Sequence, residues 1–174
     1  RVAIIGAGPI GLLLLKAIRL QGATHITVVD RVASRAAFAE QSGADISVTD
    51  IAHLQPDAYD VVVDASGAPA ILPATLDWVR HGGVLLWFGV PPSGAMISLE
   101  PFKIFRKGLS IYSSFTSVRN SYQAVNLLGS GRITVADLVS HTFALEELQR
   151  GIELIEKGEG VRKVLIMPNG PVNP

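Results

Sequence analysis

The sequence predicts an α/β protein in which a doubly wound parallel sheet of six strands is followed by a strand–helix–strand tail. Short β-branched runs alternate with longer helical patterns, which is typical of βαβ units. The strand segments are continuously apolar, as in ITVV and VLLWF, which is expected where helices cover both faces of a sheet. Hydrophobic residues make up 48% of the 174 residues and charged residues only 17%, so a sizeable core is expected.

The expected elements follow one another in the order strand, helix, strand. Strands are predicted over Val2–Ile5, Ile26–Val29, Ile46–Val48, Val61–Val63, Val84–Phe88 and Leu109–Tyr112. Helices are predicted over Ile10–Gln21, Ser34–Ser42, Pro69–Arg80, Phe102–Lys107 and Ser121–Gly129. These elements form one domain, residues 1–138.

The tail, residues 139–174, has a different pattern. We expect an extended piece at Thr142–Leu145, an amphipathic helix over Glu146–Lys157 and a last strand at Val164–Met167. In that helix Leu148, Ile152 and Ile155 fall on one apolar stripe.

Composition argues against several classes of partner. Fifteen basic and fifteen acidic residues cancel, and no basic patch stands out, so no nucleic-acid partner is expected. The most hydrophobic run, Pro9–Ile18, is interrupted by Lys16 and is far shorter than the roughly 20 residues of a bilayer span. No membrane association is therefore expected. The chain has no cysteine, which excludes disulfides and cysteine-ligated zinc within it and suits a cytoplasmic protein.

A glycine-rich turn follows the first strand and opens the first helix. Gly6-Ala7-Gly8-Pro9-Ile10-Gly11 has the form G-x-G-x-x-G. In this context Gly6 allows the tight turn, Gly8 allows a pyrophosphate to approach the backbone, and Gly11 allows close helix–sheet packing. Pro9 suits the first helical turn, whose free N–H groups and dipole would face the phosphates. The motif predicts a Rossmann-type dinucleotide site.

The residue that ends the second strand bears on the choice of dinucleotide. Asp30 follows the glycines by about 20 residues, where a carboxylate accepts the hydroxyls of an adenosine ribose. The same carboxylate would repel the 2′-phosphate of NADP, so NAD is favoured. Arg31 could receive that phosphate and Arg35 could reach the ribose edge, although both also suit a solvated surface.

Other chemistry finds little support in the sequence. The four histidines share no metal-ligand spacing, so no metal site is expected. A G-x-S-x-G elbow and a phosphate-loop lysine are both absent, which argues against a hydrolase and an NTPase. We interpret Asp60 and Asp64, which flank the fourth strand, as cap or turn residues rather than as an acid/base pair. No catalytic residue is therefore assigned in this chain.

Several stretches together resemble one family. They are VAIIGAGPIG with HITVVDR, the segment VDASGAP at 63–69, GGVLLWFGVPP at 82–92, GRI with LVSHTF over 131–143, and GEGVRKV at 158–164. In this order they resemble the C-terminal, coenzyme-binding domain of the medium-chain, zinc-type alcohol, sorbitol and threonine dehydrogenases. The resemblance covers nearly the whole chain and implies a Rossmann fold and an oxidoreductase.

The resemblance also implies roles at matching positions. Gly8, Pro9 and Ile10 would touch the pyrophosphate and one face of the nicotinamide, and Arg162 would reach the cofactor phosphate. An arginine suits that task because its guanidinium forms a fork of donors.

Further positions would border the two ends of the cofactor. Ser66 and Gly67 would lie on the adenine–ribose side, although Ser66 also suits a helix cap. Phe88, Gly89 and Val90 would offer backbone groups and apolar walls near the nicotinamide carboxamide. The last positions that the resemblance assigns are Ser114 and Phe115, at the end of the sixth strand.

Finally, the resemblance implies partners. In this family a catalytic lobe precedes the coenzyme domain and carries the ligands of the zinc, and none of it is in this chain. The fragment alone should bind NAD(H) and catalyse little or nothing, and its tail would pack on that lobe. A homodimer is expected through Met96–Ser98 and Leu109–Ser113 at the sheet edge. Two alternatives stay open: a stand-alone dinucleotide-binding or sensing module, and a zinc-free quinone or enoyl reductase, against which the GAGPIG form counts.

Overall fold

The larger sheet contains six parallel strands in the order β3-β2-β1-β4-β5-β6. The computed structural model describes residues 1–117, 119–158 and 160–170. This strand order is that of the doubly wound dinucleotide-binding fold, as the sequence predicts. The strands of this sheet are β1 Val2–Ile5, β2 Ile26–Val29, β3 Ile46–Val48, β4 Tyr59–Asp64, β5 Val79–Trp87 and β6 Ser110–Ser113.

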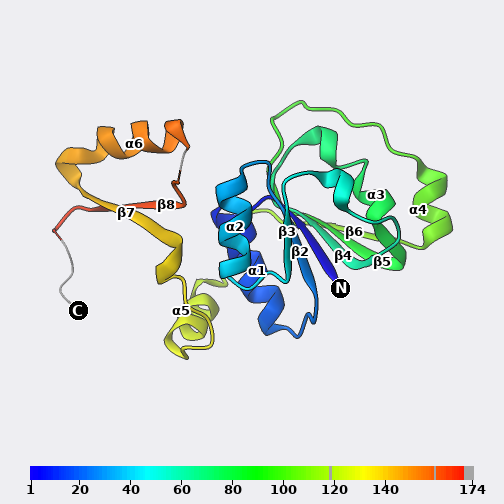
Figure 1. Cartoon of the computed structure of the whole chain (residues 1–174), viewed down its shortest axis with the longest axis horizontal. Helices are drawn as coiled ribbons and strands as arrows, with labels where there is room; N and C mark the ends of the chain where they lie inside the picture. The colour runs from blue at the N-terminus through cyan, green and yellow to red at the C-terminus, as the bar shows by residue number, and fades with distance from the viewer. Residues whose placement is uncertain (118, 159, 171–174) are drawn as a thin grey trace.

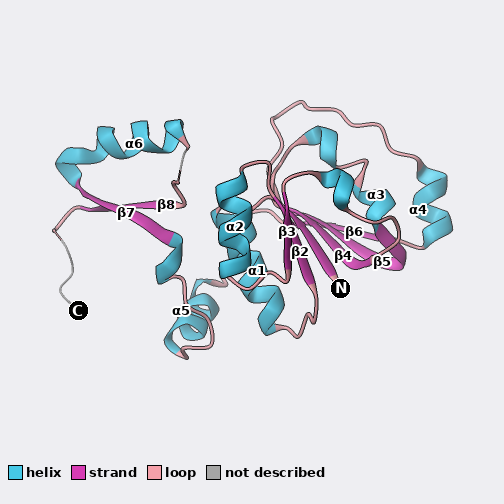
Figure 2. Ribbon diagram, in the orientation of Figure 1, coloured by secondary structure: helices cyan, strands magenta, loops and turns pink. Residues whose placement is uncertain are grey.

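Helices cover both faces of this sheet (Figures 1 and 2). Helices α1 and α2 lie on one side, and α3 and α4 lie on the other. The α-helices are α1 Pro9–Leu20, α2 Ala33–Gln41, α3 Thr75–Trp78, α4 Pro101–Lys107, α5 Ser121–Gly129 and α6 Leu148–Lys157. The 3₁₀ turns are η1 Ile51–His53, η2 Pro69–Ile71, η3 Ala136–Leu138 and η4 Leu145–Glu147.

Alternate residues of the central strand enter two separate cores. Ile4 of β1 packs with Leu12 and Leu15 of α1 in the first core. Ile5 of β1 packs with Leu76 of α3 in the second core. Because the side chains of a strand alternate between the two faces of its sheet, both faces must be apolar, which explains the continuous hydrophobic run.

The predicted helix over Pro69–Arg80 is wrong. The structure has only η2 and the short helix α3 there, and Arg80 already belongs to β5. Pro73 lies between the two helical pieces and has no N–H to donate back to the carbonyl of Pro69, so a continuous helix is interrupted. Strand β5 also begins earlier than predicted, with a register shift after the pair Tyr59↔Val79. Gly82 lies in this irregular part with φ of +70°.

The tail forms a second, two-stranded parallel sheet. Strand β7, Val139–Ala144, pairs with β8, Lys163–Met167, and α6 connects them. Strand β7 begins three residues before the start of the predicted extended piece and ends one residue before the end of that piece. Its extent differs because it is set by pairing with β8. The apolar stripe of α6 faces outward, with Leu148, Ile152 and Ile155 between 42% and 55% exposed.

The end of the first domain and the tail both pack beside α1 and α2 (Figure 1). Leu138 is 4% exposed and belongs to the first core. Lys16 forms an ion pair of 2.8 Å with Asp137, and the Arg162 guanidinium lies 4.0 Å from the centroid of the Phe38 ring. Among the described residues, no helix combines the length and the apolar character that crossing a membrane requires.

Candidate functional site

A cleft of about 760 Å³ lies where β1, β2, β3 and β4 end. We call it the strand-end cleft. Its volume falls within the range of small-molecule sites. In doubly wound sheets, ligands bind at this edge, where the strand order reverses between β1 and β4. The cleft is lined by Ile5, Gly6, Gly8, Val29, Asp30, Arg31, Val32, Arg35, Thr49, Asp50, Ile51, Ala65, Ser66, Ala68, Ala70 and Ile71.

The glycine turn brings the start of α1 against the end of β1. Gly6 has φ of +105°, a conformation that side chains disfavour. A Cβ added to Gly11 would lie 1.8 Å from the carbonyl oxygen of Gly6. The first turn of α1 therefore packs directly on the backbone of the preceding loop, which is the close approach that the motif predicts.

Gly8 differs from these two glycines because the space beside it is open. No atom lies within 4 Å of the position that a Cβ on Gly8 would take, and Gly8 lines the strand-end cleft. It is the N-cap of α1, with Pro9 in the first turn and the first helical bond running from Leu12 N to Gly8 O at 3.0 Å. The amides before Leu12 have no acceptor within the helix, so this position suits a phosphate.

Asp30 supports the glycine turn and faces the same cleft. Its Oδ2 accepts a hydrogen bond of 2.8 Å from Ala7 N, and its Oδ1 accepts one of 2.9 Å from Val32 N. Each carboxylate oxygen has a further lone pair. The orientation of the carboxylate is therefore fixed by the backbone, while acceptor capacity is left for the hydroxyls of a ribose.

Two cations stand beside Asp30 at the rim of the strand-end cleft. Arg31 is exposed, whereas Arg35 is partly buried and its Nη2 lies 3.5 Å from the carbonyl oxygen of Gly158. Both line the cleft, so the structure brings them together with Asp30 and the glycine turn.

Ser66 and Gly67 form a turn after β4. The Ser66 hydroxyl donates to Asp64 Oδ1 at 2.5 Å and accepts from Ala68 N at 3.2 Å. The hydroxyl thus supports the turn at the start of η2, and the carboxylate of Asp64 is a turn acceptor, in line with the interpretation from the sequence. Phe88, Gly89 and Val90 form the neighbouring turn after β5 and are not part of the cleft lining.

Other predicted site residues lie elsewhere. Ser114 and Phe115 follow β6 at the outer edge of the sheet, where Phe115 is 87% exposed. The Arg162 guanidinium stacks on Phe38, and its Nε donates to the Asp137 carbonyl at 3.2 Å. None of these three residues lines the strand-end cleft. Pro9, Ile10 and Gly11 begin α1 next to the cleft, and Ile10 is 45% exposed.

One wall of the cleft was missed by sequence reasoning. Thr49, Asp50 and Ile51 follow β3, while Ala70 and Ile71 belong to η2. A signal existed for the first group, because β3 was predicted and the carboxyl ends of parallel strands meet at one edge. The second group had none, because a long helix was predicted there.

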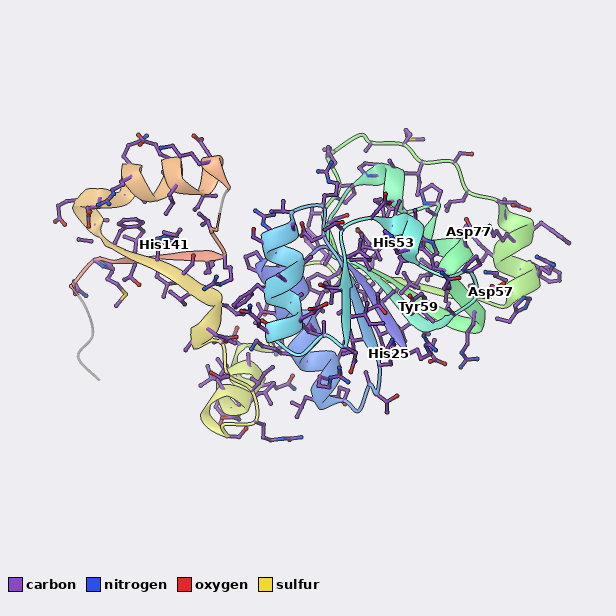
Figure 3. All side chains as sticks on the ribbon, viewed as in Figure 1. His25, His53, Asp57, Tyr59, Asp77 and His141 are labelled. Atoms are coloured by element: carbon purple, nitrogen blue, oxygen red, sulfur yellow. The ribbon has the colours of Figure 1, made fainter. Side chains whose placement is uncertain are left out.

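No metal centre accompanies the cleft. Within residues 1–117, 119–158 and 160–170, no group of three or more His, Asp or Glu side chains could hold a metal ion. Figure 3 shows His25, His53 and His141 well separated from one another.

Comparison with known proteins places this fold and cleft in a family. The family model for zinc-binding dehydrogenases matches residues 9–130. The chain belongs to the zinc-binding dehydrogenase family.

Individual relatives agree with this assignment. The D-altritol 5-dehydrogenase of Agrobacterium fabrum is 38% identical over 147 residues, which are 83% of this chain and 44% of the relative. A zinc-binding dehydrogenase structure from Sinorhizobium meliloti, solved with NADP, has a TM-score of 0.87 and 29% identity over 96% of this chain and 52% of that one. An alcohol dehydrogenase from Escherichia coli, solved with NADH, has a TM-score of 0.86 and 25% identity over 95% and 51%. The chain therefore spans about half the length of its relatives.

Proposed function

We propose that this chain is the NAD(H)-binding part of a zinc-type dehydrogenase that acts on alcohols or polyols. The observation that carries the proposal is the open space beside Gly8, at the amino end of α1 and in the same cleft as the Asp30 carboxylate. This combination suits a pyrophosphate and a ribose at one site. The relatives named for altritol oxidation and for alcohol oxidation support the substrate class.

NAD is proposed over NADP because the Asp30 carboxylate, held by Ala7 N and Val32 N, lies where a 2′-phosphate would bring a second negative charge. Arg31 and Arg35 line the same cleft and would lessen this repulsion. Relatives have been solved with NADP and with NADH. The comparisons support dinucleotide binding, and the preference for NAD rests on Asp30.

For the reaction, we propose hydride transfer between the carbinol carbon of the substrate and the nicotinamide of NAD. When bound, the dinucleotide supplies this chemistry, while residues of the chain hold and orient it. The zinc ligands and the substrate pocket are proposed to lie in the part of the relatives that this chain does not match, so the chain alone should have little or no activity.

Two surfaces are proposed as interfaces of the whole protein. Strand β6 is at the edge of the sheet and pairs only with β5 among the described residues, which leaves one side open for a second copy. Met96–Ser98, expected to join this interface, does not form a strand. The outward stripe of α6 is proposed to pack on the catalytic lobe. A cytoplasmic location stays a prediction.

The proposal is tested by titrating the chain with NADH and following nicotinamide fluorescence. Gly8→Ala should weaken binding about tenfold or more, because the methyl group enters the space proposed for the pyrophosphate. The free energy of unfolding should change by no more than about 1 kcal/mol, because no protein atom lies within 4 Å of the new Cβ and only the N-cap preference for glycine over alanine is lost. Gly129→Ala is the matched control, since Gly129 also has open space around it but lies in α5. Failure of the wild type to bind, or equal binding by Gly8→Ala, would overturn the proposal.

A further inference from the structure

Asp64 is a fully buried carboxylate at the carboxyl end of β4. Its two oxygens accept three hydrogen bonds, all from the turn that follows: Oδ1 from Ser66 N at 3.0 Å and from Ser66 Oγ at 2.5 Å, and Oδ2 from Gly67 N at 3.1 Å. None of the ion pairs among the described residues involves Asp64. Hydrogen bonds from the turn therefore satisfy this buried carboxylate, and no cation among the described residues pairs with it.

The backbone of the same residue holds the second turn. The carbonyl oxygen of Asp64 accepts from Phe88 N and from Gly89 N, each at 2.9 Å. One residue thus anchors the turn after β4 with its side chain and the turn after β5 with its main chain.

The two turns are also in direct contact through their glycines. A Cβ on Gly89 would lie 2.1 Å from Gly67 N and 2.8 Å from Asp64 Oδ2. A Cβ on Gly67, which has φ of +69°, would lie 2.5 Å from the carbonyl oxygen of Val90. Only glycine fits at both positions, so a movement of one turn must displace the other.

Only one of these two turns lines the strand-end cleft. Ala65, Ser66 and Ala68 line the strand-end cleft together with Asp30. The turn after β5 lies outside that lining, one strand further from the point between β1 and β4 where the strand order reverses. A dinucleotide with its ribose at Asp30, after β2, and its pyrophosphate at Gly8, after β1, must extend past β4 toward that turn.

We propose that Asp64 is a positioning residue that couples the strand-end cleft to the turn after β5, by holding the cleft-lining Ser66–Gly67 turn against the Phe88–Val90 turn. This inference rests on the proposed dinucleotide function. A carboxylate is required because donors meet both of its oxygens, whereas an asparagine would turn its NH₂ group toward one of them.

The test compares NADH with ADP-ribose, which lacks the nicotinamide. In Asp64→Asn, we expect the Kd of ADP-ribose to rise about threefold and that of NADH about thirtyfold, because loss of the Gly67 contact releases the turn after β5 as well. Equal factors for both ligands would mean that Asp64 only stabilises its own turn, and unchanged affinities would mean that it positions nothing. Either result overturns the proposal.

The matched control is Asp60→Asn, at the other end of the same strand, which should leave both affinities unchanged. Its carboxylate is 42% exposed and pairs with Arg80 and the N-terminal amine. If Asp64→Asn does not fold, Ser66→Ala removes the hydrogen bond of 2.5 Å to Asp64 Oδ1 without adding an atom, and it should show the same excess loss of NADH affinity. Equal losses in that variant would overturn the coupling.

Amide hydrogen exchange provides a readout without any ligand. In Asp64→Asn, the amides of Gly67, Phe88 and Gly89 should all exchange faster than in the wild type. Faster exchange at Gly67 alone would overturn the coupling. Because this measurement needs no cofactor, a wild type that binds no NADH would refute the proposed function separately from the link between the turns.

Discussion

The Nζ of Lys107 lies 2.5 Å from Oδ1 of Asp57, which joins the end of α4 to the loop before β4. The side chain of Lys107 is only 3% exposed, and Nζ also donates to the carbonyl oxygens of Leu76 at 2.6 Å and Val79 at 2.8 Å. These carbonyls lie within α3 and at the start of β5. The buried lysine thus donates to carbonyl groups that no further turn of the short helix α3 satisfies.

Replacing this lysine should destabilise the domain. Lys107→Met keeps much of the side-chain volume but leaves two buried carbonyl groups without their donor, at a cost of about 2–3 kcal/mol in the free energy of unfolding. Chemical denaturation measures the change. Lys103→Met is the control, because its partner Asp77 is 54% exposed and the loss should stay below about 1 kcal/mol. A loss at Lys107 no larger than that at Lys103 would contradict this prediction.

Acid should weaken the fold through a few carboxylates. The hydrogen bond from Lys107 lowers the pKa of Asp57, and that from Arg19 lowers the pKa of Asp45. Since these pKa values are lower in the folded chain than the unfolded value of about 3.9, their contribution to stability is present above that value and is lost as the pH falls through the folded pKa values.

The pH dependence can be assigned to one of these pairs by mutation. The free energy of unfolding, followed by urea denaturation between neutral pH and about pH 3, should fall less steeply in Asp57→Asn than in the wild type. Asp50→Asn serves as the comparison. Its carboxylate bonds only to Ala52 N within its own turn and has no cationic partner among the described residues. Identical acid slopes in the wild type and Asp57→Asn would show that the Lys107 pair contributes nothing.

The glycine turn is expected to be intolerant of substitution at its third glycine. Gly11→Ala would place a methyl group 1.8 Å from the Gly6 carbonyl oxygen, a backbone atom that cannot move aside as a flexible side chain can. We expect a loss of about 3 kcal/mol or more in the free energy of unfolding, measured by chemical denaturation. Gly8→Ala, without neighbours, is the internal comparison. Equal stability of the two variants would mean that the helix tolerates a shift at this contact.

Much of this architecture could be predicted from the sequence because its signals are local. The continuous apolar runs identify the strands of the parallel sheet, and the glycine motif with Asp30 locates the turn and the carboxylate that supports it. Arg162 illustrates the limit. Its match to a family position implies a phosphate contact, yet here its guanidinium stacks on Phe38 in α2, a contact that depends on how the tail meets the first domain.

Asp64 shows a second limit. From the sequence it could be interpreted only as a strand-end turn residue, and that interpretation agrees with the bonds to Ser66 and Gly67. Its contact with the turn after β5 depends on the pairing of β4 with β5, which no local pattern encodes. The same applies to β7, whose extent follows from β8, about 20 residues further along the chain.

The choice between NAD and NADP can be tested at Asp30. Asp30→Asn removes the charge and keeps one acceptor oxygen, so it can retain only one of the hydrogen bonds from Ala7 N and Val32 N, a loss that should affect both cofactors alike. Because the repulsion of the 2′-phosphate disappears, the ratio of the NADPH Kd to the NADH Kd should fall about tenfold. Fluorescence titrations with both cofactors measure the ratio. Arg31→Gln keeps Asp30 and removes the neighbouring cation, so it should raise this ratio instead. An unchanged ratio in both variants would show that the 2′ position of the adenosine ribose is recognised elsewhere.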